Sequence, residues 1–304
     1  MKGLIARLSP IAAARLAGTV PPQAYFVVSA VFHYLGPAFA VLLFARVDVL
    51  GVAWLRIATA AAVFAAWRRP WRLLSRLDGE GRRLLFAWGT VLAVMNACFY
   101  AAIDRLPLGT VAAIEFVPVV ALAAAGARTR RNALALALAV GGVYTLTGVR
   151  IEGEALAVGL ALANAALFAL YIVLGHRVSR LGGMGGIDGL AGAMLVAALV
   201  ATPMAGWAAA PAFADPLALV AGAGVGIASS VIPYVCDQLA MARLARSSHA
   251  LLNSLLPATA TVIGILVLAQ LPSLVELAGV TLVIAGVALH RGKTCGHANS
   301  ESVI

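Results

Sequence analysis

Glu115 and Arg56 are ionisable residues in the middle of long apolar stretches of the sequence. If these stretches cross a membrane as helices, Glu115 lies about 12 Å inside the helix that Pro107 opens. A charged group at this depth is costly unless it faces a bundle interior or a water-filled cavity. Glu115 is therefore a candidate for proton transfer or solute binding, with Arg56 as its companion. The alternative is structural: the two residues form a permanent pair that holds two helices together.

Polar and aromatic residues recur at helical spacing in other apolar stretches. Asn164, Phe168 and Tyr171 stand at i, i+4 and i+7 and therefore share one face of a helix. Such a face suits a pocket for a small amphipathic solute, although packing and hydrogen bonds between helices explain each single residue at least as well. The other candidate residues for solute binding or gating are His33, Asn96, Tyr100, Tyr234 and Asn253.

Four prolines lie within the apolar stretches, at Pro37, Pro118, Pro233 and Pro257. Proline removes a backbone donor and can kink or break a helix. Secondary transporters bind solutes where their helices are interrupted. We therefore predict helix breaks at these prolines beside the candidate site, although proline is frequent in membrane helices generally.

The usual motifs of several enzyme classes are absent from the sequence. It has no G-x-x-x-x-G-K-S/T loop, no G-x-S-x-G elbow, no H-E-x-x-H and no C-x-x-C. These motifs supply phosphate binding, a serine nucleophile and zinc ligands. We therefore expect no ATP hydrolysis, no metal and no cofactor.

The elements that carry the candidate residues follow from the apolar pattern. The chain is 62% hydrophobic and 11% charged, whereas about 25% of the residues in a soluble domain are charged. Apolar runs of about 20 residues match a hydrocarbon core roughly 30 Å thick, and long spans in lipid must be helical to satisfy their backbone. We predict an all-α integral membrane protein with ten transmembrane helices, at residues 22–45, 48–67, 84–104, 107–127, 132–149, 155–176, 187–208, 216–238, 247–269 and 273–290.

The basic residues alternate between the gaps that separate these runs. Of the 22 Lys and Arg residues, 18 lie in gaps on the side of the N-terminus and 3, Arg46, Arg105 and Arg150, lie in the opposite gaps. Arg56 is the remaining one. Because Lys and Arg accumulate in short cytoplasmic loops, both termini are predicted to be cytoplasmic. This topology also explains the net charge of +10, so we expect no nucleic-acid partner.

Two segments indicate an internal repeat. Residues 98–106 (CFYAAIDRL) and 236–244 (CDQLAMARL) both have a Cys followed seven residues later by Arg-Leu. Since five helices form an odd number of crossings, the second unit must begin on the other side of the membrane, which gives two inverted five-helix repeats. The predicted divisions are a cytoplasmic N-terminal segment 1–21, repeats 22–149 and 150–290, and a cytoplasmic tail 291–304. One G-x-x-x-G, at Gly222 and Gly226, permits close helix contact and leaves a homodimer open.

Six short segments match a known pattern: GVAWLRIA at 51–58, PWRL at 70–73, MNACFY at 95–100, PLGTVAAIEF at 107–116, ALYIVLGHR at 169–177 and IPY at 232–234. With ten helices in two halves, the chain resembles the EamA-type transporters of the drug/metabolite transporter superfamily over roughly residues 22–290. It looks most like their threonine and homoserine exporter branch. The resemblance implies an inner-membrane exporter that works by alternating access. It also implies that the site includes positions used by the branch, Arg56, Asn96, Tyr100, Glu115, Tyr171 and Tyr234.

The chain departs from the branch in its second half. Leu256 precedes Pro257 where the branch usually has Glu, and Ala269-Gln270 replaces Gly-Glu. With fewer polar groups, the pocket is expected to prefer a more apolar or aromatic solute than threonine, since a pocket selects partly by the polar groups that a ligand satisfies.

We therefore expect a secondary transporter, not an enzyme, that exports small amino acids or related metabolites across the lipid bilayer of the inner membrane. Proton coupling and facilitated efflux both fit the sequence. One alternative is an exporter of drugs, sugars or nucleotide derivatives, because a fold does not fix a function. The other is an integral-membrane enzyme that modifies lipids.

Overall fold

The computed structural model describes residues 21–75, 77–126, 129–180, 186–241 and 255–289, and these ranges contain helices and no strand. Six segments there are long and apolar enough to cross a membrane: Gln23–Leu43, Val49–Arg68, Gly79–Ile103, Glu154–Val178, Ile187–Ala214 and Pro216–Asp237. Three shorter apolar helical segments are Leu108–Pro118, Leu256–Leu268 and Leu274–Leu289. The protein is therefore an all-helical membrane protein, as the sequence predicts.

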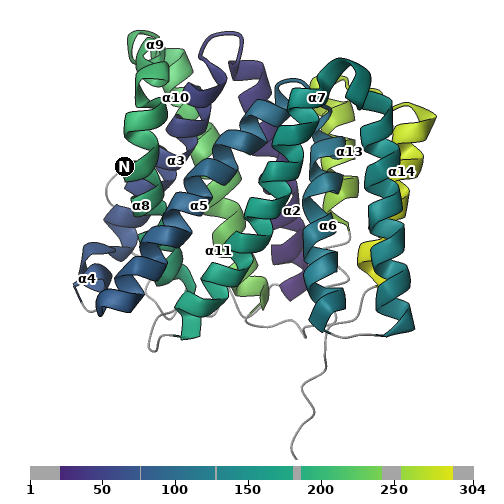
Figure 1. The fold of residues 1–304 in the computed structure, drawn as a ribbon. Helices are drawn as coiled ribbons and strands as arrows, with labels where there is room; N and C mark the ends of the chain where they lie inside the picture. Colours follow the sequence, from purple (N-terminus) through teal and green to yellow (C-terminus); the bar gives the residue numbers. More distant parts are fainter. Residues whose placement is uncertain (1–20, 76, 127–128, 181–185, 242–254, 290–304) are drawn as a thin grey trace, which may run out of the picture.

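The helices form one bundle (Figure 1). In chain order its longer helices are α2 (Pro22–Leu43), α3 (Val49–Arg68), α5 (Gly79–Ile103), α6 (Leu108–Gly126), α7 (Arg130–Arg180), α8 (Gly186–Ala205), α10 (Pro216–Gly226), α11 (Ile232–Met241), α13 (Leu256–Leu268) and α14 (Leu274–Leu289). The short helices α4 (Trp71–Leu74) and α9 (Ala210–Ala214) lie at opposite ends of the bundle. These ends are called the α4 end and the α9 end below.

Helix α7 covers two of the predicted spans. Its backbone leaves helical geometry at Glu154, with φ −135° and ψ 36°, and the chain turns back there near the α9 end (Figure 1). The predicted runs 132–149 and 155–176 are therefore two helices that meet at this turn and share the label α7. The arms contact α5, α6 and α14.

Aspartate side chains begin several helices. Asp48 accepts a hydrogen bond from the Leu50 N–H, Asp78 from the Gly81 N–H, and Asp215 from the N–H groups of Leu217 and Ala218. Such caps satisfy backbone donors that have no partner inside the helix. The polar residues between the apolar runs therefore set where α3, α5 and α10 start.

Two of the predicted helix breaks do not occur. Helix α2 continues past Pro37 and α6 continues past Pro118. A proline removes one backbone hydrogen bond, and the neighbouring helices hold the rest of the turn in place. Pro257 lies in the first turn of α13, where its missing donor costs nothing. Only Pro233 adjoins an irregular segment, the π-helical residues Ile227–Val231 (η3) between α10 and α11.

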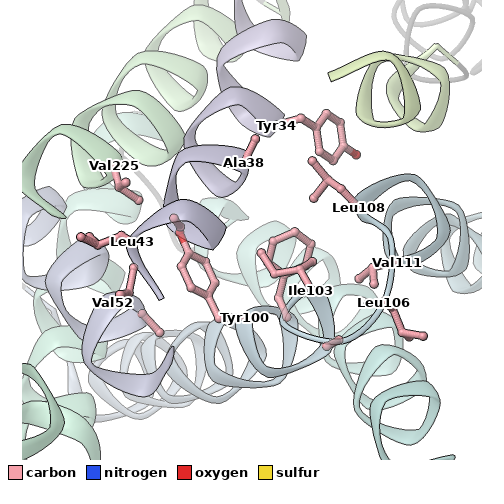
Figure 2. Packing of buried hydrophobic residues seen from close by; sticks show 14 of the residues in the cluster. Tyr34, Ala38, Leu43, Val52, Tyr100, Ile103, Leu106, Leu108, Val111 and Val225 are labelled. Carbon is pink, nitrogen blue, oxygen red and sulfur yellow. The ribbon is translucent and has the colours of Figure 1, made fainter. Parts of the chain in front are cut away.

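The core joins helices that are far apart in the sequence. Tyr34 of α2, Tyr100 and Ile103 of α5 and Leu108 of α6 belong to one cluster of buried side chains (Figure 2). All four side chains are at most 2% exposed. Helix α2 also packs against α11 and α13. The N-terminal helix is thus surrounded by C-terminal ones, and a shared interior lies between them.

Candidate functional site

A buried cavity lies inside the bundle, with about 450 Å³ of space between its side chains, including its opening. Residues from α2, α3, α5, α6, α7 and α11 line it: His33, Pro37, Arg56, Met95, Asn96, Phe99, Glu115, Asn164, Phe168, Tyr171 and Tyr234. The cavity therefore brings one cation and one carboxylate together with amides and aromatic rings.

Arg56 is the cation of the cavity and is only 6% exposed. Its Nε donates to Ser230 Oγ at 2.9 Å, and its Nη2 donates to the Ser229 carbonyl oxygen at 3.2 Å. Its guanidinium carbon also lies 5.4 Å from the centre of the Tyr100 ring. A buried charge is tolerated only when it has such partners. Arg56 is thus held by the π-helical segment on one side and by an aromatic ring on another.

Glu115 is the carboxylate of the cavity and is also 6% exposed. Its Oε1 accepts a hydrogen bond of 3.1 Å from Nδ2 of Asn164, a side chain with no exposed surface. Among the described residues, no ion pair of 4 Å or less joins Glu115 to Arg56. In this conformation the two groups are therefore not paired, because each has a different neutral partner.

Aromatic rings form the remaining wall. Phe168 and Tyr171, on one face of α7, stack with their centroids 6.3 Å apart and an interplanar angle of 9°. Trp88 packs on Tyr171 at 5.4 Å, and Phe116 packs on Phe168 at 6.3 Å. Rings that support one another in this way are fixed in position. They give the cavity an aromatic surface beside its charged groups.

Asn96 is buried and bonds to the backbone of its own helix. It is 2% exposed, and its Nδ2 donates to the Leu92 carbonyl oxygen of its own helix at 2.9 Å. This bond leaves the amide oxygen and the second N–H of Asn96 unused. His33 packs edge to face on Tyr34 at 5.1 Å.

The cavity contains most of the predicted site residues. Those that line it are His33, Arg56, Asn96, Glu115, Asn164, Phe168, Tyr171 and Tyr234, together with Pro37. Tyr100 lies behind Arg56 and is fully buried. Asn253 lies outside the described residues, and Pro118 and Pro257 do not line the cavity.

Sequence reasoning missed Met95, Phe99 and Ser229 as parts of the site, and it placed Ser230 only on a helix face shared with Tyr234. Met95 and Phe99 are four residues apart, so they form a stripe on the helix next to the stripe of Asn96 and Tyr100. Helical spacing could therefore have included them. The two serines carried a weaker signal, because a serine in a membrane helix usually bonds to its own backbone.

A second, smaller cavity of about 260 Å³ lies between α6, α13 and α14. Gln270 contributes its side chain there, and its Oε1 accepts from the Leu108 N–H at 3.0 Å. The residue that departs from the branch pattern thus caps the first turn of α6.

In the described parts of the chain, no group of three or more His, Cys, Asp or Glu residues could hold a metal.

A bundle of membrane-spanning helices around a buried cavity with charged and aromatic walls defines a polytopic membrane protein that handles small solutes. The comparisons with known proteins give the family: the chain belongs to the EamA-like transporter family, whose sequence profile matches residues 155–291. The threonine/homoserine exporter RhtA of Escherichia coli K12 is 32% identical over 257 residues, which cover 82% of this chain and 84% of that protein. The exporter of the same name from Salmonella typhimurium LT2 is 31% identical over the same length.

A crystal structure with 17% sequence identity shares the fold. Its TM-score is 0.57, and the match covers 88% of this chain and 96% of the other. The chain is thus a membrane transporter and not an enzyme, as its relatives are named exporters.

Proposed function

We propose that the protein exports small α-amino acids, or closely related metabolites, by alternating access between its two halves. One observation carries this proposal: the cavity holds Arg56 and Glu115 without pairing them. An amino acid is a zwitterion, and it loses its hydration when it enters a buried site. The site must therefore offer one partner of each charge.

The two groups suit the two ends of a zwitterion. A guanidinium matches a carboxylate through parallel N–H donors, so Arg56 binds the α-carboxylate. Glu115 accepts from the α-ammonium group, and the Asn164 amide beside it stays bonded to the same carboxylate. The relatives that are named threonine/homoserine exporters move solutes of this class.

The aromatic wall receives the side chain of the solute. Phe168, Tyr171 and Tyr234 line it, and rings of this kind favour apolar or aromatic groups over a hydroxyl. We therefore propose that the preferred substrates have larger or more apolar side chains than threonine.

The charge pattern supports a specific topology. Ten crossings in two inverted five-helix repeats, residues 22–149 and 150–290, explain the alternation of Lys and Arg and place both termini in the cytoplasm. The α4 end is then cytoplasmic, since the basic residues Arg68 and Arg69 lie beside α4. The protein resides in the inner membrane. Proton coupling through Glu115 and a homodimer are further parts of this hypothesis.

Transport by the purified protein in liposomes tests the proposal. Uptake of radiolabelled threonine, homoserine, leucine and phenylalanine is measured with and without a pH gradient. We expect saturable uptake of at least one amino acid, with leucine or phenylalanine preferred to threonine. Proton coupling predicts that the gradient drives accumulation. A protein that moves no amino acid but moves a sugar, a nucleotide derivative or a drug would contradict the proposal.

A further inference from the structure

The π-helical segment η3 lies between α10 and α11, which form one membrane crossing. Arg56 contacts this crossing at η3. In a π-helix each N–H bonds to the carbonyl five residues earlier, and here the Ile232 N–H bonds to the Ile227 carbonyl. In an α-helix the Ser229 carbonyl would accept from the backbone N–H of residue 233, but Pro233 has no N–H. The Ser229 carbonyl accepts from Arg56 instead.

Two close contacts fix the segment between α2 and α3. A methyl group at Gly36 of α2 would lie 2.8 Å from the Ser229 nitrogen, and one at Gly226 of α10 would lie 2.8 Å from the Arg56 carbonyl oxygen. Only glycine permits such an approach. This part of the crossing therefore packs closely against both α2 and α3.

The two hydrogen bonds to η3 occupy two of the N–H donors of the Arg56 guanidinium. Arginine has five N–H donors, and Ser230 and Ser229 bind the Nε–H and one Nη2–H. These bonds fix the plane of the group. The guanidinium carbon lies over the Tyr100 ring, and Arg56 lines the cavity.

We infer that the π-helical segment, and Ser230 in particular, positions Arg56 to receive the carboxylate of the solute and thereby sets the preference for carboxylate-bearing solutes. Ser230 is a positioning residue, since it acts through Arg56. The inference rests on the proposed function in one respect, namely that the solute carries a carboxylate. It adds the reason why Arg56 can discriminate such solutes, since an arginine side chain without these bonds has many rotamers.

The test compares an amino acid with its carboxamide, which keeps the ammonium group and the side chain but has no carboxylate. Each is used unlabelled to inhibit uptake of the labelled amino acid into liposomes. The ratio that matters is the inhibition constant of the carboxamide divided by that of the amino acid, and it is above one if the carboxylate is recognised. For Ser230→Ala we expect this ratio to fall about tenfold towards one, because a hydrogen bond to a charged group is lost. Ser230→Thr keeps the hydroxyl and should restore the ratio.

Ser29→Ala is the matched control. Ser29 is a buried serine that donates to the Pro233 carbonyl of the same crossing at 3.2 Å but does not bond to Arg56. Its ratio should equal that of the unmutated protein. If Ser230→Ala weakens binding of both compounds equally, or leaves the ratio unchanged, the inference is overturned.

Failure of the proposed function is seen separately, in the unmutated protein. A wild-type protein that moves no amino acid removes both ideas, whereas one that transports normally and shows no change in the ratio removes only the role of Ser230. If Ser230→Ala does not fold, Ser230→Cys, which preserves the size of the side chain but bonds weakly, should lower the ratio in the same way. A ratio unchanged in Ser230→Cys would contradict the inference equally.

Discussion

The cation and the carboxylate of the cavity are held in different ways. Arg56 has two oxygen acceptors on a segment about 170 residues away in the sequence, and a ring packs on it. Glu115 has one amide donor, although a carboxylate can accept about four hydrogen bonds. Arg56 is therefore fixed before a solute arrives, whereas Glu115 keeps most of its capacity for the solute or for a proton.

Both groups also connect the proposed halves. Arg56 and Glu115 belong to residues 22–149, while Ser230 and Asn164 belong to residues 150–290. A movement of one half against the other must therefore carry these bonds along or break them. The single bond of Glu115 is the easier one to exchange, which makes it the better candidate for coupling solute binding to the movement.

Replacement of Arg56 should have the largest effect on transport. Arg56→Ala removes the carboxylate partner, and loss of one member of a buried charge contact costs about 2–5 kcal/mol, so we expect kcat/KM to fall at least about thirtyfold. Arg56→Lys keeps the charge without the planar donors and should recover part of the activity. Uptake into liposomes measures both. Arg46→Ala, which removes an arginine with 56% of its side chain exposed, is the control and should transport normally.

Replacement of Glu115 should have the next largest effect and tests the other end of the solute. Glu115→Gln keeps an oxygen for Asn164 but removes the negative charge. Inhibition of uptake by a free amino acid should weaken about tenfold, whereas inhibition by its N-acetyl derivative, which has no ammonium group, should not change. If protons move through Glu115, accumulation driven by a pH gradient is also lost. Glu80→Gln, an exposed carboxylate in the first turn of α5, serves as control, and equal weakening for both compounds would exclude an ammonium contact.

The site could be predicted from sequence where helical spacing alone decides the arrangement. Asn164, Phe168 and Tyr171 lie on one regular helix, so their common face follows from their numbers. The approach of Arg56 to Ser229 and Ser230 could not be predicted in this way. The π-helical segment shifts the helical register of its crossing. It also packs against α2 and α3, which come from a distant part of the chain.

The fold shows the same division. Apolar length and polar gaps predicted helices close to their observed bounds, because burial of apolar side chains in lipid and aspartate caps are local properties. The continuity of α2 and α6 through Pro37 and Pro118 was not predicted. It depends on neighbouring helices that replace the lost backbone bond, and these neighbours come from distant parts of the chain.

The glycine contacts that hold the Arg56 side of the cavity predict a loss of stability. In Gly226→Ala the new methyl group would press on the Arg56 carbonyl and on Thr59 of α3, and overpacking of this kind costs about 1–3 kcal/mol. The thermal unfolding midpoint in detergent should fall. Gly224, two residues earlier, has nothing within 4 Å of the same methyl position, so Gly224→Ala should not lower the midpoint. A similar decrease in both variants would mean that helix geometry, and not the contact with α3, requires glycine.

The smallest effect is expected far from the cavity, at the α9 end. The Asp215 carboxylate accepts from the Ala218 N–H and from the Arg46 side chain at 3.0 Å, and these bonds hold the pKa of Asp215 below its usual value. The stabilisation is therefore complete above the usual aspartate pKa of about 3.9 and is lost as the pH falls through the lowered value. Asp215→Asn keeps the helix cap but loses the ion pair, so it should lower the unfolding midpoint slightly at neutral pH and not in strong acid. Asp48 caps α3 and has no arginine partner among the described residues, so a decrease of the same size in Asp48→Asn would assign the effect to capping alone.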